Sequence, residues 1–236
     1  MFRLNPKLER QALTERFARD RRVQIADFLD PDAAAALHAE LKRREDWRQI
    51  VNSGERVFDL DRASRAALSP EQVQALDDAV FAGARTGFQH RYEAIRVPDE
   101  AEARAASGDM LAAFAAWLSG DEARDLLREV TGAPSIDFAD AQATAYAPGD
   151  FLTAHDDDVA GKQRHAAYVF GLIPQWRIEW GGLLLFHGDD GQVERGFVPR
   201  FNSLALFAVP QLHSVSMVTR AAPYRRYSIT GWLRSR

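Results

Sequence analysis

A histidine followed by three aspartates, His155-Asp156-Asp157-Asp158, is the stretch whose residue types are best suited to chemistry. Aspartates favour turns and repel one another, so a solvated loop between strands is the simplest interpretation. His155 and Asp157 are two residues apart, however, and on a strand edge both side chains would point the same way and could bind one metal ion. The pair alone is weak evidence, because an H-x-D sequence occurs by chance in about one chain in three of this size.

A second histidine, His213, could complete a metal site with this pair. Pro210 ends the preceding predicted strand, so the His213 imidazole would lie at a strand mouth, where jelly rolls open their cavities. His155, Asp157 and His213 would then form the set of two histidines and one carboxylate that binds iron in non-haem Fe(II) oxygenases. That set leaves coordination positions open for a co-substrate and oxygen.

The remaining histidines have other predicted roles. His38 and His90 fall in segments predicted to be helical, where surface or capping roles are usual. His165 and His187 flank predicted strands but have no carboxylate two residues later, and His187 belongs to HGDDG, a predicted hairpin turn. His187 is therefore the only serious competing ligand.

The last predicted strand, RRYSITGW, would place a guanidinium, two hydroxyls and an indole on one face: Arg226, Ser228, Thr230 and Trp232. If that face is inward, Arg226 is a buried charge with no partner nearby in sequence. A bound carboxylate would match its planar guanidinium group. The alternative is that Arg226 pairs with a structural aspartate or faces solvent.

The composition restricts the kind of protein and of metal. The 236 residues suffice for a single domain, 1–236, and 46% hydrophobic with 27% charged residues is ordinary for a globular protein. There is no cysteine, so thiolate metal sites and cysteine nucleophiles are excluded. A net charge of -4 gives no reason to expect nucleic acid, and the lack of a signal-like or membrane-spanning apolar stretch predicts a cytoplasmic protein with no membrane partner.

Residues 1–134 are predicted to be mostly helical and to support the rest of the chain. The expected helices cover 30–45, 69–88, 110–118 and 122–130. A capping box from Ser69 to Gln72 begins the second helix. Its apolar stripe must pack on something and consists of Val73, Leu76, Val80, Ala84 and Phe88. The acidic, alanine-rich segment 97–109 predicts a mobile loop.

From residue 135 the apolar pattern changes to a period of two, which indicates strands. At least seven are expected, at 135–146, 164–173, 181–187, 192–198, 203–209, 213–219 and 225–234. Gly and Pro separate them at short spacing, which favours a sandwich or jelly roll and hence an α+β fold class.

The order of motifs resembles the Fe(II)- and 2-oxoglutarate-dependent dioxygenases. Y-x-P-G-D-x-L-x-x-H-x-D spans 146–157, W-x-x-x-W-G-G begins at Trp176, and R-Y-S-I-T-G-W spans 226–232 after the distal His213. The sequence is most similar to the prolyl 4-hydroxylase-like branch, which includes hydroxylases of ribosomal and hypoxia-response proteins. The match covers about the last 100 residues and implies a double-stranded β-helix (jelly roll, cupin-like) core at 135–236 with N-terminal supporting helices.

The resemblance also implies roles for individual residues. His155, Asp157 and His213 match the iron ligands, Arg226 matches the arginine that binds the distal carboxylate of 2-oxoglutarate, and Tyr146 matches a tyrosine that reaches the same co-substrate. Ser228 and Thr230 are on the same strand face as Arg226, so they are also predicted to bind the co-substrate. Trp232 is predicted to line the substrate site. The implied cofactors are Fe(II), 2-oxoglutarate and optionally ascorbate.

Two features depart from the family pattern. The thirteen residues from His213 to Arg226 (226 minus 213) are more than is usual, which implies a wider turn and leaves Arg225 as a fallback. A second co-substrate tyrosine has no certain counterpart, although Tyr168 is near. Asp156 and Asp158 are expected to point to the opposite face from Asp157 and to hold the loop, with a role in orienting a ligand left open.

The leading hypothesis is a dioxygenase that hydroxylates a carbon centre, specifically a prolyl residue of a protein or peptide rather than a free amino acid. A free amino acid would need a further inward arginine, for which Arg164 and Arg200 are the candidates. One alternative is a jelly-roll module that binds a sugar or carboxylate and has a structural metal. Another is a cupin-type isomerase, which would need His187 or a glutamate as a fourth ligand and would work without oxygen.

Overall fold

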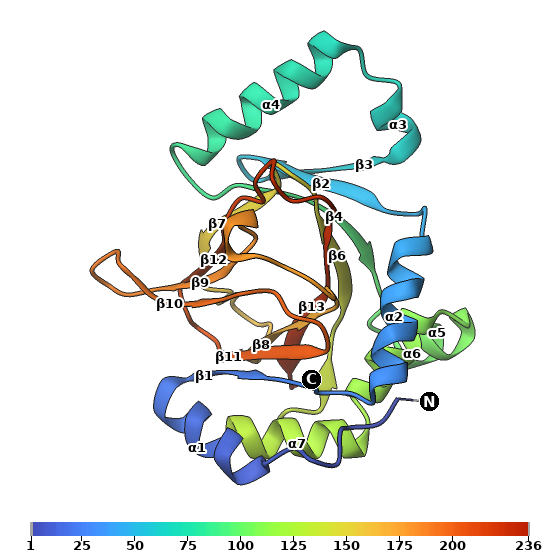
Figure 1. The fold of residues 1–236 in the computed structure, drawn as a ribbon, viewed down its shortest axis with the longest axis vertical. Helices are drawn as coiled ribbons and strands as arrows, with labels where there is room; N and C mark the ends of the chain where they lie inside the picture. The colour runs from blue at the N-terminus through green and yellow to red at the C-terminus, as the bar shows by residue number, and fades with distance from the viewer. Residues whose placement is uncertain (1, 236) are drawn as a thin grey trace.

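Strands form the centre of the molecule and helices cover it, as seen in a computed structural model that describes residues 2–235 (Figure 1). The helices are α1 (Arg10–Asp20), α2 (Pro31–Arg43), α3 (Arg62–Ala66), α4 (Pro70–Ala84), α5 (Ala101–Ser107), α6 (Met110–Leu118), α7 (Asp121–Thr131) and the 3-10 turn η1 (Ile178–Trp180). The first strands are β1 (Arg22–Ile25), β2 (Arg48–Ser53), β3 (Arg56–Asp61), β4 (His90–Arg96), β5 (Phe138–Ala139), β6 (Gln142–Tyr146) and β7 (Phe151–His155). The others are β8 (Arg164–Gly171), β9 (Leu184–His187), β10 (Val193–Phe197), β11 (Ser203–Ala208), β12 (His213–Val215) and β13 (Arg226–Arg234).

The strands are joined in one antiparallel sheet that curls into a jelly roll. Its path runs β1-β11-β8-β13-β6-β4-β7-β12-β9-β10, with β2, β3 and β5 attached at its sides. Helices α1 and α7 lie at one end next to β1, α2, α5 and α6 lie along one side, and α3 and α4 cover the other end beyond the β2–β3 hairpin (Figure 1). The predicted α+β jelly roll with supporting helices is confirmed.

The first 134 residues also contribute strands to this sheet. β1 pairs with β11, and β4 pairs with both β6 and β7. The strand expected at 135–146 is interrupted between β5 and β6. One strand, β7, is not among the predicted strands; it precedes the three aspartates and carries His155 at its end.

Local sequence signals explain where two helices begin. The Asp30 carboxylate accepts hydrogen bonds from two backbone N–H groups of the first turn of α2, and Pro31 follows it. Leu37 and Leu41 on the inner face of α2 are fully buried, and each contributes about 2 kcal/mol of hydrophobic stabilisation. At α4 the capping box of Ser69 and Gln72 is present as predicted.

The apolar stripe predicted for α4 is only partly correct. Val80 is buried and packs with Val51 and Phe151, but Val73 is 43% exposed. Phe88 lies beyond the end of the helix, beside the cavity described below. The helix is shorter than predicted because the chain turns at residues 85–87 and enters β4.

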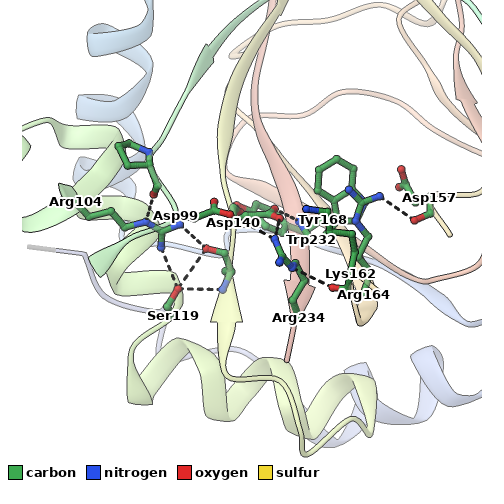
Figure 2. A network of polar contacts seen from close by, with 12 residues as sticks. Asp99, Arg104, Ser119, Asp140, Asp157, Lys162, Arg164, Tyr168, Trp232 and Arg234 are labelled. Carbon is green, nitrogen blue, oxygen red and sulfur yellow. Dashed lines mark hydrogen bonds and ion pairs between the residues drawn. The ribbon is translucent and has the colours of Figure 1, made fainter. Parts of the chain in front are cut away.

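The segment 97–109 is not a mobile loop, as the sequence predicted, because it contains α5 and a buried arginine. The Arg104 side chain (Figure 2) is 5% exposed and donates hydrogen bonds to the carbonyl oxygens of Pro98, Ala115 and Ala139. These bonds fasten the segment to α6 and to β5. Since Ala115 and Ala139 lie outside the segment, its own composition gave no indication of these bonds.

Hydrophobic side chains fill two sides of the sheet. The larger cluster joins the helices to one face of β8, β11 and β13. A smaller one, which includes Phe186 and Phe207, lies inside the roll. No helix within residues 2–235 is long and apolar enough to cross a membrane.

Candidate active site

A cavity of about 400 Å³ opens into the inside of the jelly roll. His155, Asp157 and His213 lie at one end of its lining, and Arg226 and Tyr146 belong to the same lining. The walls between them are mostly apolar side chains of the smaller core cluster. A concave, mostly apolar site with a few convergent polar groups is typical of a small-molecule pocket.

The three residues of the predicted metal site converge. His155 ends β7 and His213 begins β12, and the two are direct partners across these antiparallel strands. The Asp157 carboxylate lies between the imidazoles, with Oδ1 3.4 Å from His155 Nε2 and Oδ2 3.4 Å from His213 Nε2. One ligand atom from each residue lies within 4.8 Å of the others, so the group could hold a metal ion.

Asp157 reaches the site by a different geometry from the one predicted. β7 ends at His155, and Asp157 lies past it with a left-handed backbone (φ 65°) that aspartate tolerates better than most residues. A turn, and not strand alternation, brings its carboxylate to His155. Asp156 and Asp158 are exposed, and the Asp156 side chain accepts the Asp158 N–H at 3.1 Å, so this carboxylate holds the turn as predicted.

Backbone contacts fix the tautomer of both histidines. His155 Nδ1 lies 3.0 Å from the Thr153 oxygen and His213 Nδ1 lies 2.7 Å from the Gln211 oxygen. A carbonyl oxygen can only accept, so each Nδ1 carries the proton and each Nε2 directs a lone pair at the shared site. Burial and the neighbouring His155 lower the pKa of His213 to about 4, which keeps it neutral and able to bind a metal.

The Arg226 side chain faces into the roll without a carboxylate partner. It is 3% exposed, and its Nε has no hydrogen-bond partner in the described part of the chain. Its guanidinium carbon lies 5.1 Å from the centre of the Tyr146 ring, which itself stacks on Tyr92 at 5.1 Å. Arg225 points elsewhere, with Nη1 2.7 Å from Glu93 Oε2. The fallback assignment to Arg225 is therefore not needed.

The glycines of the W-x-x-x-W-G-G motif allow close packing beside Arg226. A Cβ at Gly182, where φ is +63°, would lie 3.0 Å from Arg226 Cδ. A Cβ at Gly181, where φ is +69°, would lie 2.0 Å from the Met217 carbonyl oxygen. Only glycine fits both the backbone conformation and the space, so this motif helps to shape the arginine end of the cavity.

The inward face of β13 is occupied in part as predicted. Thr230 and Trp232 line the cavity. Ser228 is buried, but its hydroxyl lies 2.8 Å from Thr144 Oγ1 and it is not part of the cavity lining. Ser228 therefore supports the wall and is not placed to contact a ligand directly.

A polar chain connects β13 to the turn that carries Asp157 (Figure 2). Asp140 accepts the Trp232 backbone N–H at 2.6 Å and lies 3.1 Å from Arg234 Nη1. The Arg164 guanidinium stacks 3.6 Å from the Trp232 ring centre, and its Nη1 donates to the Asp157 carbonyl oxygen at 2.9 Å. Arg164 thus lies in the cavity lining, whereas Arg200 is exposed and outside it.

Three residues of this cavity were missed from the sequence: Phe88, His90 and Tyr92. His90 is in β4 and not in a helix, as predicted; it is 7% exposed and its Nε2 has no partner among residues 2–235. Burial and the neighbouring His155 lower the pKa of His90 to about 4. The alternation in QHRYEAIR could have identified a strand with His90 and Tyr92 on one face.

The other candidates lie outside the cavity or point away from it. His187 Nε2 is 2.8 Å from Ser214 Oγ, His165 Nε2 contacts Ser135 and Ser235, and His38 lies in α2 as predicted. The Tyr168 hydroxyl donates to the Asp140 carbonyl oxygen at 2.7 Å, so Tyr168 is not the missing co-substrate tyrosine. Tyr92, stacked on Tyr146, lies in the cavity lining.

The fold and site define a class: a jelly roll with two histidines and one carboxylate at the mouth of an arginine-containing cavity. Residues 141–234 match the family model described as the 2OG-Fe(II) oxygenase superfamily. The resemblance predicted from the sequence is thus confirmed for this region, which is similar to a superfamily whose name gives 2-oxoglutarate and Fe(II), and His155, Asp157 and His213 could hold the iron.

Two curated relatives are prolyl 3-hydroxylases. The chain is 34% identical over 124 residues to prolyl 3-hydroxylase sudestada1 of Drosophila melanogaster, covering 47% of this chain and 22% of the relative. It is 32% identical over 119 residues to prolyl 3-hydroxylase OGFOD1 of Xenopus laevis, covering 48% and 23%. The aligned region is thus less than a quarter of either relative.

Solved structures share the fold over almost the whole chain. A Pseudomonas putida prolyl-4-hydroxylase superposes with a TM-score of 0.60 at 24% identity, covering 96% of this chain and 99% of that one. A Trichoplax adhaerens prolyl hydroxylase, solved with a hypoxia inducible factor peptide, gives 0.61 at 14% identity, covering 96% and 89%.

Proposed function

We propose that the protein is an Fe(II)- and 2-oxoglutarate-dependent dioxygenase that hydroxylates a carbon centre, with His155, Asp157 and His213 as the iron ligands. The observation that carries this proposal is the convergence of two Nε2 lone pairs and one carboxylate within 4.8 Å, with both tautomers fixed by backbone carbonyls. With oxygen and 2-oxoglutarate, the bound iron would supply the oxidant that places one oxygen atom on the substrate carbon, while 2-oxoglutarate becomes succinate and carbon dioxide.

Arg226 is the proposed anchor for the distal carboxylate of 2-oxoglutarate. It is buried and has no carboxylate partner in the described residues, so a bidentate anion would satisfy its charge. Tyr146 lies opposite it across β13 and β6 and would contact the same group, with Thr230 further along the strand. Ser228 would support this site only indirectly, through the hydrogen bond between its hydroxyl and that of Thr144.

The protein's own groups would orient the metal ligands and line the metal end with apolar surface. Phe207 borders that end, and its ring lies 4.6 Å from that of His213. Arg164 holds the Asp157 backbone, so the carboxylate ligand keeps its direction.

The proposed substrate is a prolyl residue of a protein or peptide. The relatives are prolyl hydroxylases by name, and the Trp232 indole offers a flat wall for a pyrrolidine ring. A free amino acid is the second candidate substrate. It is favoured by the inward position of Arg164, whose guanidinium could bind a substrate carboxylate.

Mass spectrometry of candidate proteins tests this substrate proposal. Incubation with the protein, iron, 2-oxoglutarate and oxygen should add one oxygen atom, about 16 Da, to a proline, and the Asp157→Ala variant should add none. Efficient hydroxylation of free proline, with no protein labelled in a lysate, would favour the second candidate. The cytoplasmic location stays a prediction.

Turnover separates the oxygenase from the two other classes. A ligand-binding module would bind 2-oxoglutarate without converting it to succinate. A cupin-type isomerase needs a fourth ligand, and within residues 2–235 no further His, Asp, Glu or Cys joins the group of three. His187, the expected fourth ligand, is bonded to Ser214.

A further inference from the structure

The two terminal strands of the sheet border a second cavity, apart from the metal pocket. β1 pairs with β11 and β10 pairs with β9, and these strands end the path of the sheet. Residues of both line a hollow of about 780 Å³. Two aromatic rings lie between the hollow and the metal site. The Phe186 ring is 4.9 Å from the Arg22 guanidinium, and the Phe207 ring is 4.6 Å from that of His213.

Arginines from three parts of the chain surround this hollow. They come from α1, from β1, and from β10 with the segment after it: Arg16, Arg19, Arg22, Arg195 and Arg200. The lining contains two carboxylates, each already paired: Asp20 lies 2.9 Å from Arg19 Nε, and Glu194 lies 2.5 Å from Arg22 Nη2. The other three guanidinium groups have no carboxylate partner in residues 2–235, although the whole chain has a net charge of -4.

Arg22 lies in the wall of the hollow and is only partly accessible from it. Its side chain is 14% exposed, and its Nη1 atom is buried with no hydrogen-bond partner in the described chain. Because that atom is buried, an anion in the hollow would meet the accessible part of the Arg22 side chain and not Nη1.

We propose that this hollow binds a compact polyanion that carries phosphate groups, of the size of a triphosphate. Guanidinium groups match phosphate oxygens in pairs, and three unmatched positive charges suit an anion with a similar charge. The volume is within the range of small-molecule sites, about 300–1,000 Å³.

The walls disfavour two larger occupants. The Gln24 side chain donates to the Val198 carbonyl oxygen at 3.2 Å, and Arg22 bridges to Glu194, so the space between the strands is already spanned and cannot take an added peptide strand. The one aromatic side chain in the lining, Phe197, is 8% exposed, so no stacking platform for nucleic-acid bases is present there.

Calorimetric titration with tripolyphosphate at about 0.15 M salt tests the proposal. The wild-type protein should bind one equivalent, and the Arg195→Ala/Arg200→Ala variant should bind at least about tenfold more weakly. Both arginines are exposed, so the variant should fold. The matched control is Arg85→Ala/Arg220→Ala, which removes the same charge from two exposed arginines outside the hollow and should bind like the wild type.

Absence of saturable binding by the wild type, or an equal loss in both double variants, would overturn the proposal. Equal affinity for citrate would show that the site takes carboxylates as readily and would overturn the assignment to phosphate. The competing result is a single-stranded oligonucleotide that binds more tightly than tripolyphosphate and also depends on Arg195 and Arg200. That result would overturn the small polyanion as the ligand and indicate nucleic acid.

Discussion

The two ends of the metal-containing cavity differ in how their polar groups are satisfied. At the metal end, each histidine bonds a backbone carbonyl through Nδ1, and Asp157 lies between the two imidazoles. At the other end, Arg226 Nε is buried without a partner in the described residues, and its nearest charged neighbour in sequence, Arg225, is paired with Glu93 outside the cavity.

This difference separates a preorganised site from one that its ligand completes. The metal end is built from strand ends and a turn, whose backbone can hold side chains in place before any ligand binds. The arginine end is built from side chains inside strands, where neighbouring backbone groups are already paired in the sheet and only a ligand can satisfy the charge. Iron binding and 2-oxoglutarate binding should therefore respond to different substitutions.

The largest effect is expected from removing a metal ligand. His155→Ala, Asp157→Ala or His213→Ala should each lower iron affinity and turnover by at least about 100-fold, because even outer-sphere partners of metal ligands are worth 10–100-fold. Metal analysis and succinate formation measure the two losses, and circular dichroism checks the fold. His187→Ala is the control; if it lost iron while a triad variant retained full activity, the ligand assignment would be wrong.

The next largest effect is expected at the arginine end. Arg226→Ala should raise the 2-oxoglutarate concentration needed for half-maximal rate by at least about tenfold, since breaking a desolvated charge pair costs roughly 2–5 kcal/mol. Iron binding should hardly change. Arg225→Ala is the matched control, and a large effect there with none at Arg226 would reverse the assignment.

The pH dependence of stability sharpens the comparison at His90, which lies between the two ends. Its folded pKa of about 4 is below the ordinary value of 6.5, so the unfolded chain binds the proton more readily and stability falls as the pH drops below about 6.5. Between pH 7 and pH 5 the metal-free wild type should lose on the order of 1–2 kcal/mol more unfolding free energy than His90→Phe does. Urea unfolding at both pH values measures this, and identical pH dependence would show that His90 is not buried as a neutral group.

The smallest effect is expected from the aspartate next to the ligand. Asp156→Ala removes one hydrogen bond to the Asp158 N–H at the surface and should cost about 1 kcal/mol of stability or less. Iron binding, followed by metal analysis, should be unchanged. A loss of iron comparable to that of Asp157→Ala would mean that Asp156 takes part in the site.

The sequence predicted most strands of the C-terminal half because they are short apolar runs with Gly or Pro between many of them, and β13 shows a clear period of two. That alternation placed Arg226, Thr230 and Trp232 on one inward face before their surroundings were known. The connection between His213 and Arg226 is a wide turn, as predicted. Ala222 is buried inside it, and the Tyr224 hydroxyl donates to the Gln175 carbonyl oxygen.

Two of the failures, at His90 and Arg104, come from contacts with residues outside the local segment. His90 faces the cavity because β4 pairs with β7, 62 residues later at Leu152 (152 minus 90), and no local pattern encodes that pairing. Arg104 is buried because distant carbonyl groups receive its hydrogen bonds. The left-handed turn at Asp157 is different, because the residue that donates to its carbonyl oxygen, Arg164, follows closely in the sequence.

Iron-dependent conversion of 2-oxoglutarate to succinate tests the central claim most directly, because it needs both ends of the cavity in one molecule. The wild-type protein should form succinate only with Fe(II) and oxygen present; Asp157→Ala should form none, and Arg226→Ala should recover activity at high 2-oxoglutarate. Succinate formation by Asp157→Ala at the wild-type rate, or none by the iron-loaded wild type with any candidate substrate, would contradict the account.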